Sequence, residues 1–205
     1  MSTTPAILDD RVARAPFLRN LSMWMLTFLV IPIAGYVGTF IVGRVDDLLS
    51  ALAGGAFVGM VVGFAQALLS LRRLPLLPWT IASAIGMSVG VAVGTMAVGY
   101  QTSLSALALS GLITGALVGL AQTLTLPATA RFRWLWVPIT AVLWPLAWTV
   151  TTLAGIDVEE QFIVFGASGS FVYTLLAGLA LQLLIPRPAT HAPVPPAVAS
   201  LRAGR

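Results

Sequence analysis

The amino-acid sequence predicts an all-α fold, a polytopic bundle of six transmembrane helices, and three observations lead to this prediction. Of the 205 residues, 58% are hydrophobic and only 9% are charged, whereas a soluble domain carries roughly 25% charged residues. The apolar residues fall into six long spans, and most arginines lie in alternate connections between those spans. A chain of this composition cannot cover a water-facing surface, so we expect the lipid bilayer to be its partner.

Each of the six spans lacks Asp, Glu, Lys, Arg and His. About 20 apolar residues suffice to cross a hydrocarbon core of ~30 Å as a helix, which also satisfies its own backbone hydrogen bonds in lipid. The predicted helices are 21–42, 48–71, 79–100, 104–126, 134–153 and 162–185. They form one membrane domain, 21–185, which follows a cytoplasmic segment, 1–20, and precedes a Pro/Ala-rich tail, 186–205, that we expect to be disordered.

The positions of the arginines predict the orientation of the chain. The N-terminal segment, the second and fourth connections and the tail hold ten of the 11 arginines, whereas the other connections hold Arg44 and acidic residues. Positive charge stays on the cytoplasmic side during insertion, so both termini are expected in the cytoplasm. Four tryptophans near the cytoplasmic starts of the odd-numbered helices predict a ring of indoles at headgroup level: Trp24, Trp79, Trp134 and Trp136.

Two apolar segments share a glycine pattern: GAFVGMVVGFAQ, residues 55–66, returns as GLITGALVGLAQ, residues 111–122, and a weaker copy lies in the last span. This periodicity predicts three tandem helical hairpins, about 21–71, 79–126 and 134–185. Small residues four positions apart let helix backbones approach closely in a membrane. The predicted helix-packing residues are Gly55, Gly59, Gly63, Gly86, Gly90, Gly94, Gly111, Gly115, Gly119, Ser170, Thr174 and Gly178.

A glutamine closes each copy of the pattern and lies on the glycine side of its helix. One interpretation is structural: Gln66, Gln122 and Gln182 make interhelical hydrogen bonds that fix the register of the helices. The alternative is that the three amides converge on a cytoplasm-facing cavity as polar anchors for a ligand.

Trp144 and Trp148 lie four residues apart on one face of the fifth span. Their indoles either fill space where the glycine pattern lapses, or form an apolar wall for a ligand, or form a docking edge for another subunit.

The sequence offers little material for catalysis. It contains no cysteine, and its one histidine, His191, lies in the tail. No acidic residue lies within a span, so we expect no proton relay or cation site of the kind found in coupled pumps. The sequence therefore predicts a protein that is not an enzyme, with no catalytic, cofactor-binding or metal-binding residue. Because the arginines do not cluster in one stretch, nucleic-acid binding is not expected either.

Three segments suggest a family. PWTIASAIGMSVGVAVG, GALVGLAQTLTLP and GSFVYTLLAGLALQLLIP resemble uncharacterised bacterial multi-pass membrane proteins built from hairpins of a Trp-led helix and a GxxxGxxQ helix. In those proteins a Trp commonly follows the Gln, whereas Ala67 and Thr123 occupy that place here. The resemblance implies an integral protein of the bacterial plasma membrane and brings no activity with it.

Two functions are consistent with these features. The favoured hypothesis is a non-enzymatic accessory or scaffold subunit, which uses its glycine stripes and its aromatic fifth helix to pack within the protein and against a larger membrane complex. The alternative is a binding or transport protein for a small, largely apolar molecule or lipid, with the three glutamines as its polar anchors.

Overall fold

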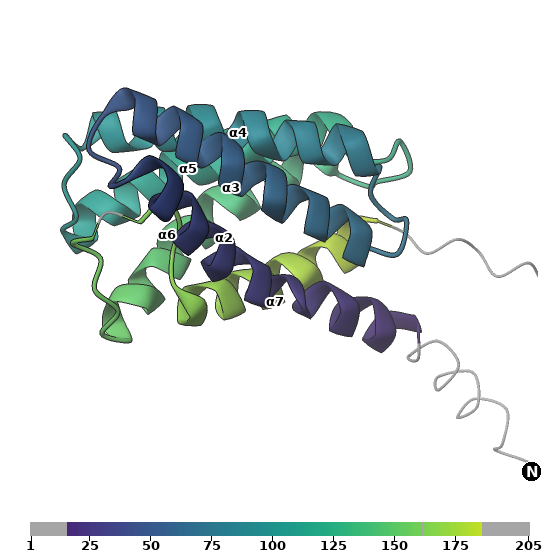
Figure 1. Ribbon diagram of the computed structural model, residues 1–205. Helices are drawn as coiled ribbons and strands as arrows, with labels where there is room; N and C mark the ends of the chain where they lie inside the picture. The colour runs from purple at the N-terminus through teal and green to yellow at the C-terminus, as the bar shows by residue number, and fades with distance from the viewer. Residues whose placement is uncertain (1–15, 161, 186–205) are drawn as a thin grey trace, which may run out of the picture.

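The computed structural model describes residues 16–160 and 162–185, and this part of the chain is all-helical (Figure 1). The first spanning helix is Pro16–Val42, whose main part is α2 (Thr27–Val42). All six long helices are apolar enough to cross a membrane. The remaining elements are α3 (Leu48–Leu69), α4 (Leu76–Ala97), α5 (Leu104–Thr125), the 3₁₀ turn η1 (Arg133–Leu135), α6 (Trp136–Leu153) and α7 (Ala167–Leu184).

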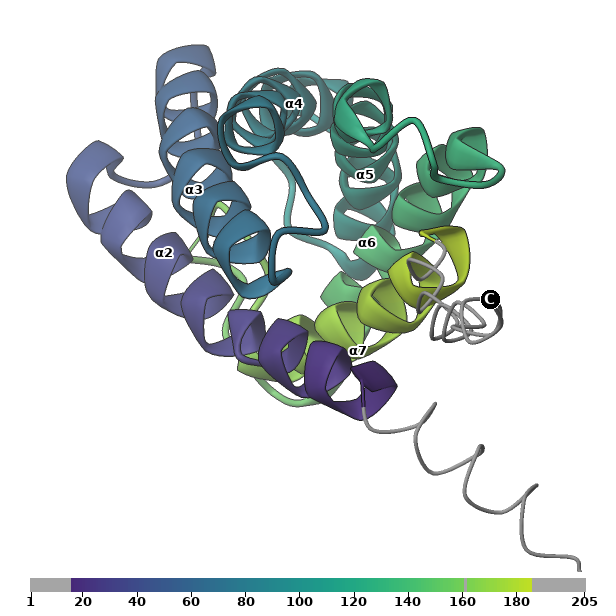
Figure 2. The same ribbon diagram turned by 90° about the vertical axis from the view of Figure 1, so that its right-hand side faces the viewer.

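The six helices form a closed ring, seen end-on in Figure 2. Each helix packs against the helices that precede and follow it in the chain, and α7 packs against α2 to complete the circuit. The helices α3, α4, α5 and α6 pack most extensively, whereas the contacts of α2 with its two neighbours are fewer. The core therefore lies inside the ring, and the first helix is the least buried of the six spans.

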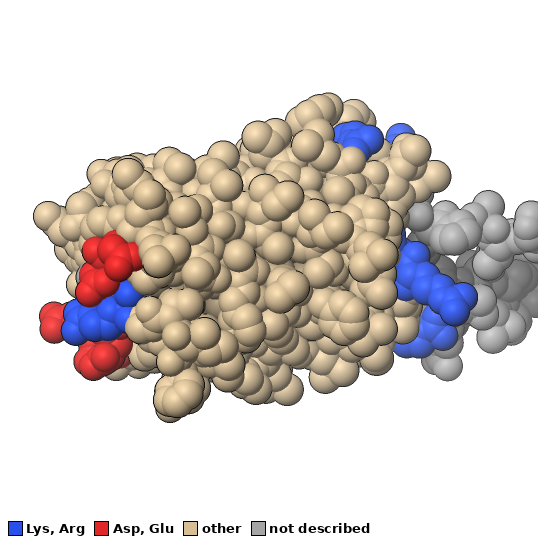
Figure 3. Space-filling view, turned by 45° about the horizontal axis from the view of Figure 1, so that its top comes forward, with Lys and Arg blue, Asp and Glu red and all other residues tan. Residues whose placement is uncertain are grey.

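Charged residues lie at the two ends of the ring (Figure 3). The acidic end carries Asp46, Asp47, Asp157 and Glu159 together with Arg44, whose Nη2 donates to the Glu159 carbonyl at 2.7 Å.

The connections after α3 and α5 carry Arg72, Arg73, Arg131 and Arg133, and we call their end of the ring, where Figure 3 shows basic side chains, the arginine end. Arg73 Nη2 donates to the Ile185 carbonyl at 2.7 Å, and the Arg131 backbone N–H donates to the Leu184 carbonyl at 2.7 Å. The first and last described residues thus lie at the arginine end (Figure 1). Most of the predicted cytoplasmic segment, the predicted disordered tail and His191 lie outside the described residues.

The start of α3 is set by local sequence. Asp47 Oδ1 accepts the Ser50 backbone N–H at 2.7 Å, and the Asp47 backbone N–H donates to Ser50 Oγ at 3.3 Å. This capping box satisfies two backbone N–H groups that would otherwise lack acceptors at the helix start. At the start of α5, Ser103 Oγ accepts the Ala106 N–H at 3.3 Å. Polar caps of this kind position the apolar helices that follow them.

The last helix begins at Ala167, so the predicted span 162–185 was wrong at its start. Residues 162–166 are not helical, although Ile163, Val164 and Phe165 are buried. The Gly166 N–H donates to Thr151 Oγ1 at 3.1 Å. An irregular backbone is tolerated at membrane depth where protein covers it, and we call residues 162–166 the inner segment. The other predicted spans overlap the helices over most of their length.

Candidate functional site

Two buried glutamines make the same contact with the helix that follows them. Gln66 Oε1 accepts the indole N–H of Trp79 at 3.1 Å, and Gln122 Oε1 accepts the indole N–H of Trp136 at 2.9 Å. In both cases the glutamine lies near the end of one helix and the tryptophan at the start of the next. The two amides are therefore held in fixed orientations inside the ring, toward its arginine end.

The predicted headgroup ring of tryptophans is wrong for three of the four residues. Trp24, Trp79 and Trp136 are buried in the protein, and Trp134 is 59% exposed. Trp24 Nε1 donates to the Thr174 carbonyl at 3.0 Å. A buried indole needs an acceptor for its N–H group, and the neighbouring helix supplies one in each case.

A further hydrogen bond extends this polar layer across the ring. Gln122 Nε2 donates to Ser83 Oγ at 2.9 Å, which joins α5 to α4. The rings of Trp79 and Trp136 lie 6.3 Å apart, centroid to centroid, at a tilt of 47°. One amide, Gln122, thus links three consecutive helices.

Gln182 has different surroundings. Its Oε1 accepts a hydrogen bond from Arg73 Nη1, and it lines a pocket of about 20 Å³ at the arginine end together with Asn20 and Ser70. Gln66 and Gln122 share a cavity that Gln182 does not line. The structure therefore brings two of the three predicted anchors together.

The glycine stripes lie where neighbouring helices approach most closely. A Cβ on Gly55 would lie 2.6 Å from the Met87 carbonyl oxygen of α4, and a Cβ on Gly111 would lie 3.0 Å from the Trp148 ring of α6. In both cases the partner is the next helix in the chain, outside the predicted hairpin. The same close approach to a neighbouring helix is found at Gly59, Gly63, Gly86, Gly90, Gly94, Gly115 and Gly119.

The weaker third stripe on α7 has a similar position. A Cβ on Gly178 would lie 2.5 Å from the Trp24 ring, and Ser170 and Thr174 are buried. The small residues of all three stripes are thus in contact within the chain, which leaves no free stripe for another subunit.

A cavity of about 30 Å³ lies inside the ring beside the two paired glutamines, with room for roughly two water molecules. Trp144 lines it and is only 4% exposed. The indole N–H of Trp144 makes no hydrogen bond of normal geometry among the described residues, and the Tyr173 hydroxyl lies beside it. The cavity is further lined by Ile31, Val58, Gly59, Val62, Gln66, Ser83, Met87, Val118, Gln122, Val164, Phe165 and Tyr173.

Gln66 adds unused hydrogen-bonding capacity to this central cavity. Its oxygen accepts from Trp79, and no hydrogen bond within the described part of the chain uses its amide N–H groups. The cavity is thus lined by two residues, Gln66 and Trp144, that carry N–H donors for a bound acceptor group.

Comparisons with protein-family models, curated proteins and solved structures found no match to this chain. Any functional conclusion must therefore follow from the geometry of the cavity and its surroundings.

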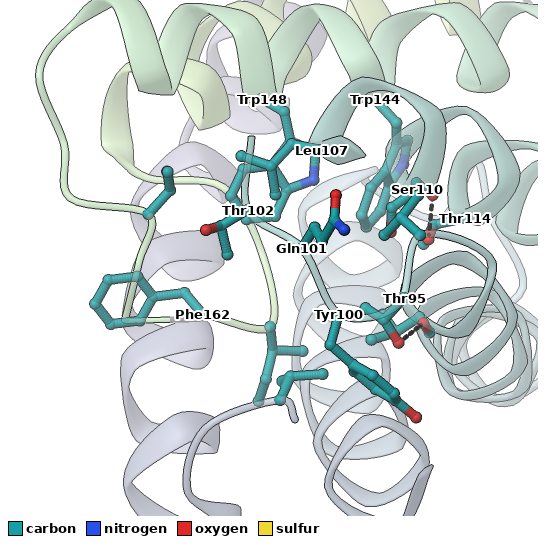
Figure 4. Close-up of a pocket in the computed structure, with 15 residues that line it drawn as sticks. Thr95, Tyr100, Gln101, Thr102, Leu107, Ser110, Thr114, Trp144, Trp148 and Phe162 are labelled. Carbon is teal, nitrogen blue, oxygen red and sulfur yellow. Dashed lines mark hydrogen bonds between the residues drawn. The ribbon is translucent and has the colours of Figure 1, made fainter. Parts of the chain in front are cut away.

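A second pocket, of about 40 Å³, lies toward the acidic end (Figure 4). Thr95, Gln101 and Thr114 line it together with Trp144 and Trp148. In Figure 4 the Gln101 amide projects toward the two indoles. Because Trp144 lines this pocket and the central cavity, its ring is the partition between them.

Both predicted aromatic residues of the fifth span face the interior. Trp144 and Trp148 are buried, and their rings meet the Phe165 ring edge-on at centroid distances of 5.1 and 6.0 Å. They form an apolar wall inside the ring, and neither is available as an outward docking edge.

Trp79, Ser83, Trp136 and Phe165 were not singled out as site residues from the sequence. The spacing does carry information about the tryptophans, because Trp79 follows Gln66 by 13 positions and Trp136 follows Gln122 by 14. The nearly equal spacing from amide to indole across a short connection is the feature that predicts these pairs. Nothing comparable in the sequence marks Phe165.

Proposed function

We propose that this chain is an integral membrane protein that binds a small, largely apolar molecule inside its ring of helices. The observation that carries the proposal is a cavity lined by Gln66, whose amide N–H groups are unused, by Trp144, whose indole N–H makes no hydrogen bond of normal geometry, and by Tyr173. A few polar groups in a mostly apolar cavity are complementary to a ligand with one polar group, such as a carbonyl oxygen, on an apolar body.

The surroundings of the cavity support a binding role over a catalytic one. Its lining, among the described residues, contains no carboxylate, imidazole or charged side chain, so we infer that the protein is not an enzyme. The cavity accepts a small polar group and not a whole molecule at its present size. The apolar body of the ligand therefore extends out of it.

We place the arginine end of the ring, with both termini, in the cytoplasm of a bacterial cell and the ring in its plasma membrane. The uneven distribution of arginine supports this orientation. The repeated contact between a glutamine and the next tryptophan supports a chain of tandem repeats, as the recurring glycine pattern predicts.

An accessory subunit of a larger membrane complex is the second candidate. One observation favours it: the apolar window of the first helix, Pro16–Val42, is 28% buried, against 39–44% for the other five spans. Large apolar side chains on the outside of that helix, including Ile33 and Phe40, are exposed and available to a partner.

The test of the binding function compares Trp144→Phe with Trp134→Phe. Both changes remove one indole N–H, but Trp144 lines the central cavity and Trp134 is exposed. The proteins are purified in mild detergent, and mass spectrometry quantifies the small molecules that co-purify. We expect Trp144→Phe to lose a molecule that wild type and Trp134→Phe retain, with circular dichroism and gel filtration unchanged.

Equal retention in all three proteins would contradict the binding function. Recovery of stoichiometric protein partners, with no small molecule that depends on Trp144, would favour the accessory subunit instead. Wild-type protein that carries neither a small molecule nor a partner would count against both candidates.

A further inference from the structure

A larger cavity, of about 210 Å³, lies in the side of the ring. Its walls come from α2, from α6 with the connection that follows it, and from the inner segment. The residues that line it include Gly35, Tyr36, Trp148, Val158, Phe162 and Phe165. We call it the side crevice. It lies beside the first helix, which is the most weakly buried of the six spans.

The side crevice opens on the outer surface of the ring. Tyr36 at its rim is 68% exposed, and Ile33 and Phe40 on the same helix are also exposed. If the six spans cross a membrane, this apolar surface faces hydrocarbon. A molecule reaching the crevice through this opening therefore comes from the bilayer.

The chemistry of the crevice fits a hydrocarbon chain. Aromatic and aliphatic side chains form most of its wall, and the hydroxyl oxygen of Thr151 already accepts the Gly166 N–H at 3.1 Å. An apolar cavity of about 150 Å³ in another protein binds benzene. The larger volume here accommodates a short length of chain without a polar anchor.

A thin partition separates the side crevice from the central cavity. Val164 and Phe165 line both spaces, and the Phe165 ring lies 5.1 Å from the Trp144 ring. The Trp144 indole is therefore in direct contact with the partition. A chain in the crevice would carry its adjoining polar group to this boundary.

We propose that the side crevice binds the hydrocarbon chain of an amphiphilic lipid taken from the surrounding bilayer, and that the acceptor group of this lipid reaches Trp144 past Phe165. Binding of the hydrocarbon chain is inferred from the side crevice alone. Contact of the acceptor group with Trp144 rests on the proposed function and identifies its ligand as a lipid.

The test uses the full chain in nanodiscs of phosphatidylcholine that contain a phosphatidylcholine with a photoactivatable diazirine in its acyl chain. After irradiation, mass spectrometry maps the residues that carry the lipid. We expect crosslinks to concentrate on Tyr36, Phe162 and Phe165. An even distribution over exposed apolar residues, such as Phe40 and Leu183, would overturn the proposal.

Two variants fill the crevice from its wall, Ala167→Phe from an exposed position and Val158→Phe from a half-buried one. Excluding roughly two methylene groups of a chain corresponds to about a tenfold loss of crosslinking at the crevice. Ala53→Phe is the matched control, since Ala53 is exposed on α3 and does not line the crevice. Undiminished crosslinking in both filled variants would also overturn the proposal.

Trp144→Phe separates this proposal from the function on which its second part rests. If the lipid chain occupies the crevice but its acceptor does not reach the central cavity, Trp144→Phe leaves the crosslinks at wild-type level. The crevice site would then stand, and the link to Trp144 would be wrong.

Discussion

Gln122 accepts the indole N–H of Trp136 at 2.9 Å, and Gln66 accepts that of Trp79 at 3.1 Å in the same way. Each bond joins the end of one helix to the beginning of the next, inside a ring whose interior is mostly apolar. Interhelical hydrogen bonds of this kind contribute on the order of 0.6–2 kcal/mol in a membrane. These bonds fix which faces of neighbouring helices meet. Close packing of the helix backbones occurs at the glycines.

Gln122→Leu should destabilise the protein more than Gln66→Leu. Gln122 also donates to Ser83 Oγ at 2.9 Å, so its loss leaves two buried groups unpaired, at a cost of about 1–3 kcal/mol for each. Unfolding by SDS in mixed micelles, followed by circular dichroism, measures the difference. Gln101→Leu is the control, because Gln101 is exposed. Equal unfolding midpoints for Gln122→Leu and Gln101→Leu would contradict the prediction.

Gly59→Ala should weaken the contact between α3 and α4. A Cβ at this position would overlap the Ser83 carbonyl oxygen, and overpacking of this kind costs about 1–3 kcal/mol. The higher helix propensity of alanine offsets about 1 kcal/mol of that cost. Ala53→Val adds carbon to an exposed face of the same helix and should leave the thermal midpoint nearly unchanged. A midpoint for Gly59→Ala at or above that of Ala53→Val would exclude steric conflict at Gly59.

Arg73→Met should loosen the end of α7. Arg73 donates to Gln182 Oε1 and, at 2.7 Å, to the Ile185 carbonyl, whereas the neighbouring Arg72 is exposed. Hydrogen exchange followed by mass spectrometry should therefore show faster deuterium uptake around residues 181–185 in Arg73→Met than in Arg72→Met. If the two variants exchange alike, these bonds do not hold the helix end.

Stability should depend on pH through Asp47. The Ser50 backbone N–H, which donates to the Asp47 carboxylate at 2.7 Å, holds the pKa of this carboxyl below its usual range. The stabilisation is therefore complete above the pKa of the unfolded chain and is lost as the pH falls through the lower pKa of the folded state. Asp47→Asn keeps a capping oxygen without the titration.

Thermal midpoints of wild type and Asp47→Asn should diverge between about pH 5 and pH 3, near the ordinary pKa of Asp, with wild type losing more stability. Asp46→Asn serves as the control, because Asp47 and not Asp46 caps α3. Parallel pH profiles for wild type and Asp47→Asn would show that the ionised carboxylate does not stabilise the cap.

Single cysteines can test the orientation, since the chain contains none of its own. In intact bacterial cells, a membrane-impermeant maleimide should label Asp157→Cys at the acidic end. Arg131→Cys at the arginine end should react only after permeabilisation, because the arginine-bearing connections are proposed to lie in the cytoplasm. The reverse pattern would place the arginine end outside the cell.

Hydrophobicity and charge predicted the six helices well, because span length depends on composition alone. The start of α7 could not be predicted this way, since Ile163, Val164 and Phe165 are as apolar as a helix but are buried by tertiary contacts. Apolar side chains suit both the lipid bilayer and the interior of a protein. The sequence therefore does not distinguish a membrane-spanning helix from an irregular segment that is buried in the protein.

The same ambiguity affects the candidate site. The glutamines were recognised because one of them closes each copy of the glycine pattern, and their helical faces followed from 100° per residue. The tryptophans were assigned to the headgroup region, because an indole suits that environment as well as a buried site beside an amide. Gln182 accepts a hydrogen bond from Arg73, which lies in the connection between α3 and α4. The position of that connection relative to the end of α7 does not follow from any periodicity in the sequence.

The order of the helices around the ring is the same as their order in the sequence, which is also the order of their synthesis. Each helix from α3 to α6 packs mainly against its immediate neighbours in the chain, and among the main contacts between helices only that of α7 with α2 joins distant parts of the sequence. Contacts that are local in sequence form quickly. Assembly can therefore proceed helix by helix during synthesis, and the seam between the first and last helices is the final one to close.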